Sequence, residues 1–392
     1  MKKTITLLFT VFGIWRLYAQ NDQQVVFKDS QLEYAIRSYM DWPTGDITKG
    51  DMLELTRLVA INREVKHLDG LEYAANLREL YLNNNMIEDL SPLSSLTKLE
   101  NLSLSGNMIE DVAPLSELIL LKKLMMDRNK ITDITPLNKL INLEGISFNF
   151  NQISDISVTS NWKQLTHFNM AFNKLEDLNP LAALTDIYGI WIPENNVSDI
   201  GMLKNMKNIH VLILGNNPVE NIQVLSGLHE LVQLNLMKTQ VRDFSSIAEL
   251  KNVGVLVLRG NEISNLDFLK EMNGVEWLDL RDNRIRDIAP IANLSRLRKL
   301  FLSGNEIKSI TSLSILENLL WIHLSHQGIN LWPLNNRKIL SDLTFQSEYK
   351  IDHGFKDSNK LVCQKLQQSG TTISVMDMVN TSIFSQFPSK IE

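Results

Sequence analysis

Residues 77–96 read LRELYLNNNMIEDLSPLSSL, and this stretch contains all the recurring positions of the pattern that decides the fold. Its central Asn85 recurs as asparagine every 22 residues along most of the chain. The same frame extends backwards to Arg63 and forwards to Gln327, giving 13 registered units of which the outer two are atypical. A register held over that length indicates an internal repeat, and the repeat determines how every other segment is interpreted.

Each unit combines two different periods. Leu80 and Leu82 alternate with other residues, which is typical of a short strand that turns both leucines inward. The apolar residues that follow, such as Leu90 and Leu93, recur at every third position, as in a tight 3₁₀ turn. With Ile87 in the last place, the unit matches the leucine-rich-repeat signature L-x-x-L-x-L-x-x-N-x-L.

The repeated asparagine follows each strand at the point where the chain must turn. Its side-chain amide can bond backbone groups that the turn leaves unpaired, so one asparagine is expected to stack over the next in a ladder. Thr239 interrupts the series, but its hydroxyl can serve a backbone group in the same place. The predicted structural ladder consists of Asn85, Asn107, Asn129, Asn151, Asn173, Asn195, Asn217, Asn261, Asn283 and Asn305.

A single unit cannot fold alone. About seven core residues, worth roughly 1.5–3 kcal/mol each, do not offset the roughly 1–2 kcal/mol that each ordered backbone residue costs. Aspartates such as Asp89, four residues after the ladder position, can cap the 3₁₀ turns. We therefore predict one α/β solenoid, a right-handed leucine-rich-repeat superhelix. Its parallel β-sheet lies on the concave face, about 60 Å long, and its short 3₁₀ or helical turns lie on the convex face.

The composition is that of an ordinary globular protein. Hydrophobic residues make up 44% and charged residues 21% of the 392 residues, and the formal net charge is −6. A chain with this balance has no basic surplus to attract nucleic acid, so we expect no nucleic-acid partner. The single cysteine, Cys363, excludes an internal disulfide and a cysteine-rich zinc module.

The N-terminus predicts export. Met1-Lys-Lys is followed by an apolar run, residues 5–15, that is too short to cross a bilayer but long enough for a signal-peptide core. Residues 17–19, Leu-Tyr-Ala, offer a cleavage site before Gln20. The alternative is a hydrophobic strand or helix of the fold itself. No later apolar stretch approaches the length of a membrane span, so we expect none.

The repeat frame also divides the chain. We predict a signal peptide over residues 1–19, an N-terminal helical cap over 20–54, the solenoid over 55–330, and a C-terminal cap and tail over 331–392. In the first cap, Asp29 is expected to start a helix whose apolar face includes Leu32 and Tyr39, and Thr48 to start a second short helix. The unit around Trp162 lacks the usual Pro-Leu pair, which predicts a local bulge on the outer wall.

The unit made up of residues 123–137 and those just before them resembles the 22-residue repeats of the internalin-type bacterial leucine-rich-repeat proteins. Residues 27–51 and 68–77 look like the helical cap and the first repeat of that group. The resemblance covers about residues 25–330. It implies an exported or surface protein that grips another protein on its concave face. The sequence shows no sorting signal or evident immunoglobulin-like domain after the repeats, so we do not expect cell-wall anchoring.

Large side chains stand at strand positions that face solvent on the predicted concave face. A protein-binding patch of aromatic anchors with a charged rim explains them. Alternatively, cross-strand neighbours simply stabilise the sheet, or the C-terminal segment folds over Trp321. The candidate partner-binding residues are Tyr81, Trp191, Ile213, Val257, Trp277, Phe301, Trp321, His323, Arg259, Arg281 and Lys299.

No motif in the sequence predicts catalysis. There is no Gly-rich phosphate loop after a strand and no nucleophile elbow, so we expect no catalytic residue, no cofactor and no enzyme activity. The repeated aspartates occur once per unit, too dispersed for a calcium cage, and we expect no metal site.

The sequence therefore predicts a secreted or surface-associated, monomeric, non-catalytic protein that binds a protein ligand of unknown identity through its concave face. Two alternatives stay open. One is a cytoplasmic regulatory scaffold of the kind that docks on a protein phosphatase. The other is a carbohydrate or cell-envelope binder that uses the tryptophans as sugar platforms.

Overall fold

The computed structural model describes residues 23–325, 329–335, 340–347 and 357–377. The predicted signal peptide, residues 1–19, lies outside the described residues. The chain consists of two units, residues 1–209 (the first unit) and 210–392 (the second unit).

The described part of the first unit begins with helices α2 (Ser30–Met40) and α3 (Lys49–Met52) and continues as a parallel sheet. Each strand pairs with the next at an offset of 22 residues, so that Leu58 lies beside Leu80. The strands are β1 (Arg57–Val59), β2 (Glu79–Tyr81), β3 (Asn101–Ser103), β4 (Lys123–Met125), β5 (Gly145–Ser147), β6 (His167–Asn169) and β7 (Gly189–Trp191).

The second unit repeats this arrangement, with parallel pairs from β8 through to β15. Its last two strands follow the repeats, and a helix connects them. The elements are β8 (Val211–Ile213), β9 (Gln233–Asn235), β10 (Val255–Val257), β11 (Trp277–Asp279), β12 (Lys299–Phe301), β13 (Trp321–Ser325), β14 (Asp342–Ser347), α4 (Asp357–Gln368) and β15 (Thr372–Asp377).

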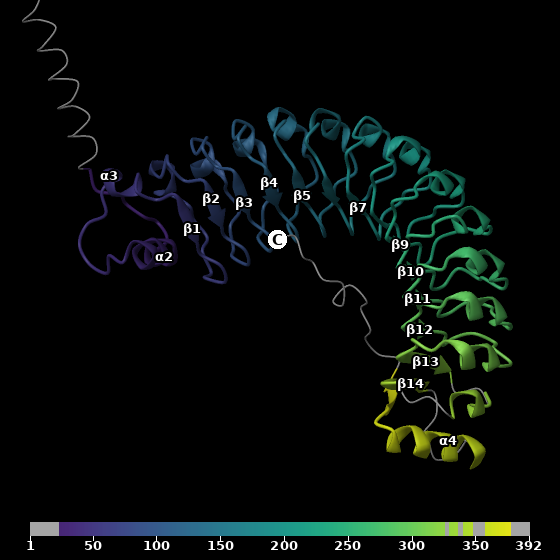
Figure 1. Ribbon diagram of the computed structural model, residues 1–392. Helices are drawn as coiled ribbons and strands as arrows, with labels where there is room; N and C mark the ends of the chain where they lie inside the picture. Colours follow the sequence, from purple (N-terminus) through teal and green to yellow (C-terminus); the bar gives the residue numbers. More distant parts are fainter. Residues whose placement is uncertain (1–22, 326–328, 336–339, 348–356, 378–392) are drawn as a thin grey trace, which may run out of the picture. The chain divides into compact units, whose positions relative to one another are not determined.

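Short 3₁₀ turns alternate with the strands, and within each unit the two kinds of element occupy opposite sides of the coil (Figure 1). The predicted leucine-rich-repeat solenoid of parallel strands and 3₁₀ turns is therefore confirmed. In the first unit the turns are η1 (Leu71–Tyr73), η2 (Ser91–Leu93), η3 (Ala113–Leu115), η4 (Thr135–Lys139), η5 (Ser157–Asn161), η6 (Asn179–Leu181) and η7 (Gly201–Asn205). In the second unit they are η8 (Gln223–Gly227), η9 (Ser245–Ile247), η10 (Asp267–Glu271), η11 (Ala289–Asn293), η12 (Thr311–Ile315) and η13 (Trp332–Leu334).

The core lies between the strands and the 3₁₀ turns. The middle residue of each three-residue strand, such as Leu80 or Leu300, is buried, and so is the apolar residue two positions later. Trp162 also belongs to this core, which corrects the prediction of a bulge: η5 is as long as η4, and the indole is fully buried. The larger ring fits because its Nε1 donates a hydrogen bond to the Leu137 carbonyl at 3.3 Å.

The ladder asparagines bridge successive repeats. Asn107 is typical: its amide nitrogen donates to Leu104 O of its own repeat at 2.8 Å and to Leu82 O of the preceding repeat at 3.1 Å. Its amide oxygen accepts from the Ile87 N–H at 3.1 Å. Thr239, which replaces an asparagine, keeps the bond within its own repeat through its hydroxyl and Leu236 O. Each amide thus satisfies buried backbone groups on two neighbouring turns of the solenoid.

The repeated aspartates cap the 3₁₀ turns, as expected. Asp89 accepts a hydrogen bond from the backbone N–H of Ser91, the first residue of η2, at 2.8 Å. Asp243 does the same for Ser245 at the start of η9. Because the first N–H groups of a helical turn have no partner within the turn, this bond fixes where the turn begins.

The Asp29 carboxylate connects the N-terminal helix α2 to the first repeat. Asp29 caps α2 by accepting from the N–H groups of Gln31 and Leu32, and its other oxygen accepts from Lys66 and His67. Burial acts to raise the pKa of Asp29, but these hydrogen bonds outweigh burial and hold the pKa below its ordinary value.

The predicted second helix and its capping box are present in α3. Thr48 accepts a hydrogen bond from the Asp51 N–H, and the Asp51 carboxylate accepts one from the Thr48 N–H. The expectation for Tyr39 was wrong, because its side chain is 46% exposed while Leu32 is buried. The apolar face of α2 is therefore narrower than its sequence pattern indicates.

Candidate functional site

One side of the sheet is turned away from the leucine core, and we call it the sheet face. It is formed by the first and third residues of each strand, because side chains alternate along a strand, and by the residue two positions beyond the strand. Every partner-binding candidate from the sequence stands at one of these positions.

Three candidates form a cluster that we call the tryptophan clamp. Trp277, Lys299 and Trp321 are the first residues of β11, β12 and β13 and lie side by side in register. The Lys299 Nζ is 4.3 Å from the centroid of the Trp277 ring and 4.6 Å from that of Trp321. Since a cation is attracted to the face of an indole at these distances, Lys299 holds both rings in place. Trp321 nevertheless stays 44% exposed.

Phe301 continues the aromatic surface along the strands. Its ring is stacked on Trp277 with 5.7 Å between centroids, and it meets the ring of His323 edge-on at 6.1 Å. The Arg281 guanidinium carbon lies 5.1 Å from the Phe301 centroid. The second unit therefore carries a continuous aromatic surface across β11, β12 and β13, bordered by cationic groups.

The arginines beside this surface are already paired with carboxylates. Arg281 donates hydrogen bonds to the Asp279 carboxylate through Nε and Nη2, with an Nη2–Oδ2 distance of 2.5 Å. Asp279 is only 1% exposed. Arg259 pairs with Asp282 at 2.6 Å. A two-point arginine–carboxylate contact fixes the geometry of both groups, so these residues form a rigid base beside Phe301.

His323 is buried on the sheet face at 8% exposure. Its Nδ1 lies 3.3 Å from Ser303 Oγ, and its Nε2 has no hydrogen-bond partner among the described residues. Burial, together with the nearby Arg281 cation, lowers the pKa of His323 from its ordinary 6.5 to about 4. The imidazole is therefore neutral at physiological pH and adds to the apolar character of the surface.

Trp191 belongs to a separate cluster in the first unit. Its ring is stacked on His167 of β6 with 6.0 Å between centroids, and His167 also lies 5.5 Å from Tyr188. The Trp191 ring lies close to Gly189, where a Cβ atom would be 2.2 Å from the Trp191 Cη2 atom. Burial lowers the pKa of His167, and the Lys123 cation lowers it further.

The remaining candidates do not join either cluster. Tyr81 lies at the other end of the first unit, where its hydroxyl contacts Glu79 at 3.3 Å and Arg57 lies 5.5 Å from its ring. Ile213 and Val257 occupy sheet-face positions, but Val257 is only 1% exposed and Ile213 is also buried. Their neighbours cover them, so they offer little surface to a partner.

Sequence reasoning missed an exposed stack beside the sheet of the first unit. Phe150 and Phe172 are parallel with 4.2 Å between centroids, and the Arg128 guanidinium lies 4.2 Å from the Phe150 ring. All three precede a ladder asparagine and have φ near +55°. Equivalent positions carry Gly106 or Asn84, which tolerate this conformation, so a bulky residue there was the available signal.

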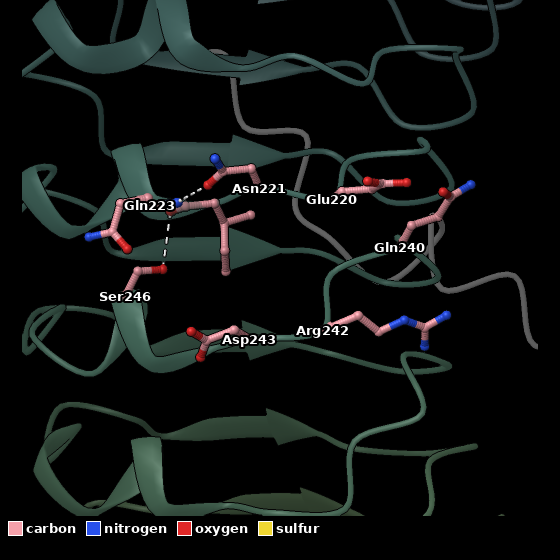
Figure 2. A pocket seen from close by; sticks show the side chains of 8 residues that line it. Glu220, Asn221, Gln223, Gln240, Arg242, Asp243 and Ser246 are labelled. Atoms are coloured by element: carbon pink, nitrogen blue, oxygen red, sulfur yellow. Dashed lines mark hydrogen bonds between the residues drawn. The ribbon is translucent and has the colours of Figure 1, made fainter.

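A polar hollow of about 560 Å³ lies apart from the sheet face, at η8 and η9 of the second unit (Figure 2). The N–H and hydroxyl groups of Ser245 hold the pKa of Asp243 below its ordinary value, so this carboxylate is a weak base. Within the described residues no group of three His, Cys, Asp or Glu side chains is arranged to hold a metal ion. The hollow is lined by Glu220, Asn221, Ile222, Gln223, Gln240, Arg242, Asp243 and Ser246.

Comparison with known proteins identifies the class of protein to which this chain belongs. The family of leucine-rich repeats (two copies) matches residues 75–117, 97–139, 141–183 and 274–319. No curated protein matches the sequence. Together with the strand-and-turn repeat and the asparagine bridges, the match makes this chain a leucine-rich-repeat protein.

Solved structures narrow the class to a family. An internalin (inlF) of Listeria monocytogenes is 29% identical with a TM-score of 0.77, over 83% of this chain and 96% of that one. Internalin C2 (inlC2) of the same organism is 32% identical with a TM-score of 0.52, over 53% of this chain and 92% of that one. The chain belongs to the internalin-type bacterial leucine-rich-repeat proteins.

A more distant structure shows the same fold. A leucine-rich-repeat protein of Leptospira interrogans is 20% identical with a TM-score of 0.67, over 83% of this chain and 97% of that one.

Of the helices in the described part of the chain, none has the length and apolar character that crossing a membrane requires.

Proposed function

We propose that this protein is a non-catalytic binding protein that holds a protein partner on the sheet face of its second unit. The observation that carries the proposal is the aromatic surface of Trp277, Phe301 and Trp321 at strand positions turned away from the core. Aromatic side chains dominate the binding energy of protein interfaces, and a contiguous exposed group of them marks an interaction site.

The surroundings of these rings favour binding because they leave little to reorganise. Lys299 contacts both tryptophans of the clamp, and the Arg281 guanidinium, which is paired with Asp279, lies against the Phe301 ring. Side chains that are already ordered lose less conformational entropy when a partner covers them. A preformed surface of this kind suits a folded partner of complementary shape.

A protein partner is favoured over a saccharide by the same contacts. Sugar platforms need an open indole face, whereas Lys299 and Phe301 already lie against the Trp277 ring.

The test is capture of a partner by the purified full-length protein, followed by alanine substitution. We expect Trp277→Ala and Phe301→Ala each to weaken the complex about tenfold or more, as central aromatic anchors do. Met125→Ala is the matched control, since Met125 holds the same register position as Phe301 but lies in β4 of the first unit. Unchanged binding by both tested variants, with native circular dichroism, rules the proposal out.

We also propose that the protein is exported and acts as a monomer. The export proposal rests on the cationic start and apolar run of residues 1–19 together with its internalin-type family. N-terminal sequencing of the protein recovered from outside the producing cell is expected to begin at Gln20. Light scattering of that material tests the monomer, and recovery of intact Met1 inside the cell contradicts export.

A further inference from the structure

In the described part of the chain, one cation of the aromatic surface differs from its neighbours in forming no ion pair with a carboxylate. Arg281 pairs with Asp279 and Arg259 pairs with Asp282. Among the described residues, Lys299 contacts the two indoles of the clamp and forms no ion pair. Lys299 is therefore the cation of this surface whose charge is not balanced by a direct ion pair, and it lies between the two indoles.

The indoles hold the ammonium without neutralising it. The face of an aromatic ring attracts a cation through its quadrupole, but the full positive charge remains. The ammonium has three N–H donors, and π faces are not oxygen acceptors. Water satisfies the charge while the surface is free, because Lys299 is only partly buried.

A partner that covers the clamp removes this water. Desolvating an unpaired ammonium is strongly unfavourable, so a partner with only apolar atoms at this point binds poorly. A carboxylate placed over Lys299 restores a short charge-assisted hydrogen bond. The rings of Trp277 and Trp321 lie on either side of this point and favour apolar neighbours for that carboxylate.

We propose that the protein partner presents an aspartate or glutamate, flanked by apolar residues, to Lys299 inside the tryptophan clamp. This inference rests on the proposed function, because it names the chemistry of the partner for the same surface. Lys299 is then the residue that selects the partner, while the aromatic rings around it supply apolar contact.

The experiment uses a random-peptide library displayed on phage and selected on the full-length protein. On the wild type we expect enrichment of peptides with an acidic residue between apolar ones. Lys299→Glu is expected to reverse the selection, so that lysine or arginine occupies the same place in the enriched peptides. Lys123→Glu is the matched control, since Lys123 is also the first residue of its strand but has no clamp around it, and it keeps the acidic preference.

Calorimetry with one enriched peptide, made synthetically, measures the contact itself. We expect Lys299→Gln to weaken binding about tenfold, the effect of losing one charge-assisted hydrogen bond. Replacing the acidic residue of the peptide with its amide is expected to give a similar loss, and the two changes together are expected to cost little more than either alone.

The outcomes separate this inference from the proposed function. Two outcomes exclude the carboxylate but leave the proposed binding surface intact. In one, enrichment is lost in Trp277→Ala and Phe301→Ala but the peptides enriched on the wild type lack an acidic residue. In the other, Lys299→Glu selects the same acidic peptides as the wild type. If no acidic peptide is enriched on the wild type, the inference is excluded. If enrichment ignores both aromatic substitutions, the proposed function itself fails. Lys299-dependent binding of acidic glycans on an array, with no peptide selected, assigns the clamp to saccharides and overturns the inference.

Discussion

At the scale of single residues, the sheet face contains a buried base that resists protonation. His323 has a pKa of about 4 in the folded protein, against 6.5 when unfolded, because burial and Arg281 disfavour its charged form. The Asp279 and Asp282 carboxylates oppose this effect and Arg259 adds to it. The folded state thus binds fewer protons than the unfolded state between these two values, and stability must fall as the pH falls through that window.

We therefore expect the wild type to lose about 3 kcal/mol of unfolding free energy between pH 6.5 and pH 4 through His323, with little further loss from this residue below pH 4. Urea unfolding at pH 7, 5.5 and 4.5 measures the loss. His323→Gln is expected to show a shallower decline, whereas His229→Gln, which changes an exposed histidine, keeps the wild-type slope. Equal slopes for wild type and His323→Gln contradict the assignment.

The interrupted ladder gives a second prediction at the same scale. Ladder residues such as Asn107 accept from the backbone N–H twenty residues earlier and donate to carbonyls of two repeats. Thr239 retains the donation to Leu236 O. An asparagine at 239 can in addition accept from the Val219 N–H and donate to Leu214 O, so Thr239→Asn is expected to stabilise the second unit by about 1 kcal/mol.

Thermal unfolding of Thr239→Asn, compared with Thr239→Ala, checks this prediction. The asparagine variant should unfold above the wild type, and the alanine variant, which loses the hydroxyl bond, should unfold below it. A lower melting temperature for Thr239→Asn means that the local backbone has adapted to threonine.

At the scale of strands and turns, glycine shapes the Trp191 cluster. Gly145, His167 and Gly189 are the first residues of β5, β6 and β7 and are neighbours in register. A methyl group at Gly189 would collide with the Trp191 ring, whereas at Gly145 the nearest atom is the His167 Cβ at 3.8 Å. Gly189→Ala is therefore expected to push Trp191 away from His167, and Gly145→Ala is not.

The measurement is the pKa of His167 by NMR titration. Burial holds this pKa below its ordinary value, so removal of the Trp191 ring should move it upward in Gly189→Ala. Gly145→Ala should leave it unchanged. An unchanged pKa in both variants, or a shift in both, shows that the indole does not cover His167.

The strands and turns also show how much of the fold the sequence predicts. The strands, the 3₁₀ turns and the aspartate caps follow from local rules that repeat in every unit, so Asp89 and Asp243 were placed correctly by spacing alone. The burial of Trp162 was not predicted, because a buried indole N–H needs an acceptor, and spacing alone does not show that Leu137 O lies within reach.

The sheet face was the least predictable element for a related reason. Spacing identifies which side chains leave the core, but their final directions depend on neighbours in adjacent strands. The covering of Val257, the insertion of Lys299 between two indoles and the pairing of Arg281 with Asp279 all arise across strands. No pattern within a single repeat contains this information.

At the scale of the whole molecule, stability comes from contacts between consecutive repeats, and a terminal strand needs a cover. β13 pairs in parallel with β14, and β14 with β15, although both later strands lie beyond the repeat pattern. Leu343 of β14 and Val362 of α4 are buried. We infer that residues 331–392 serve as the C-terminal cap of the second unit.

A chain that ends at Asn330 tests this inference, because it retains β13 and lacks β14, α4 and β15. Its β13 edge would present a row of unpaired N–H and C=O groups beside the exposed Trp321, which is a template for pairing with another chain. We expect this shortened protein to associate in light scattering and to unfold at a lower temperature than the full chain. A chain ending at Asp377, which keeps β14, α4 and β15, is the control and should behave as the full chain does. If the protein ending at Asn330 stays monomeric with an unchanged melting temperature, the repeats close their own edge and the role of residues 331–392 lies elsewhere.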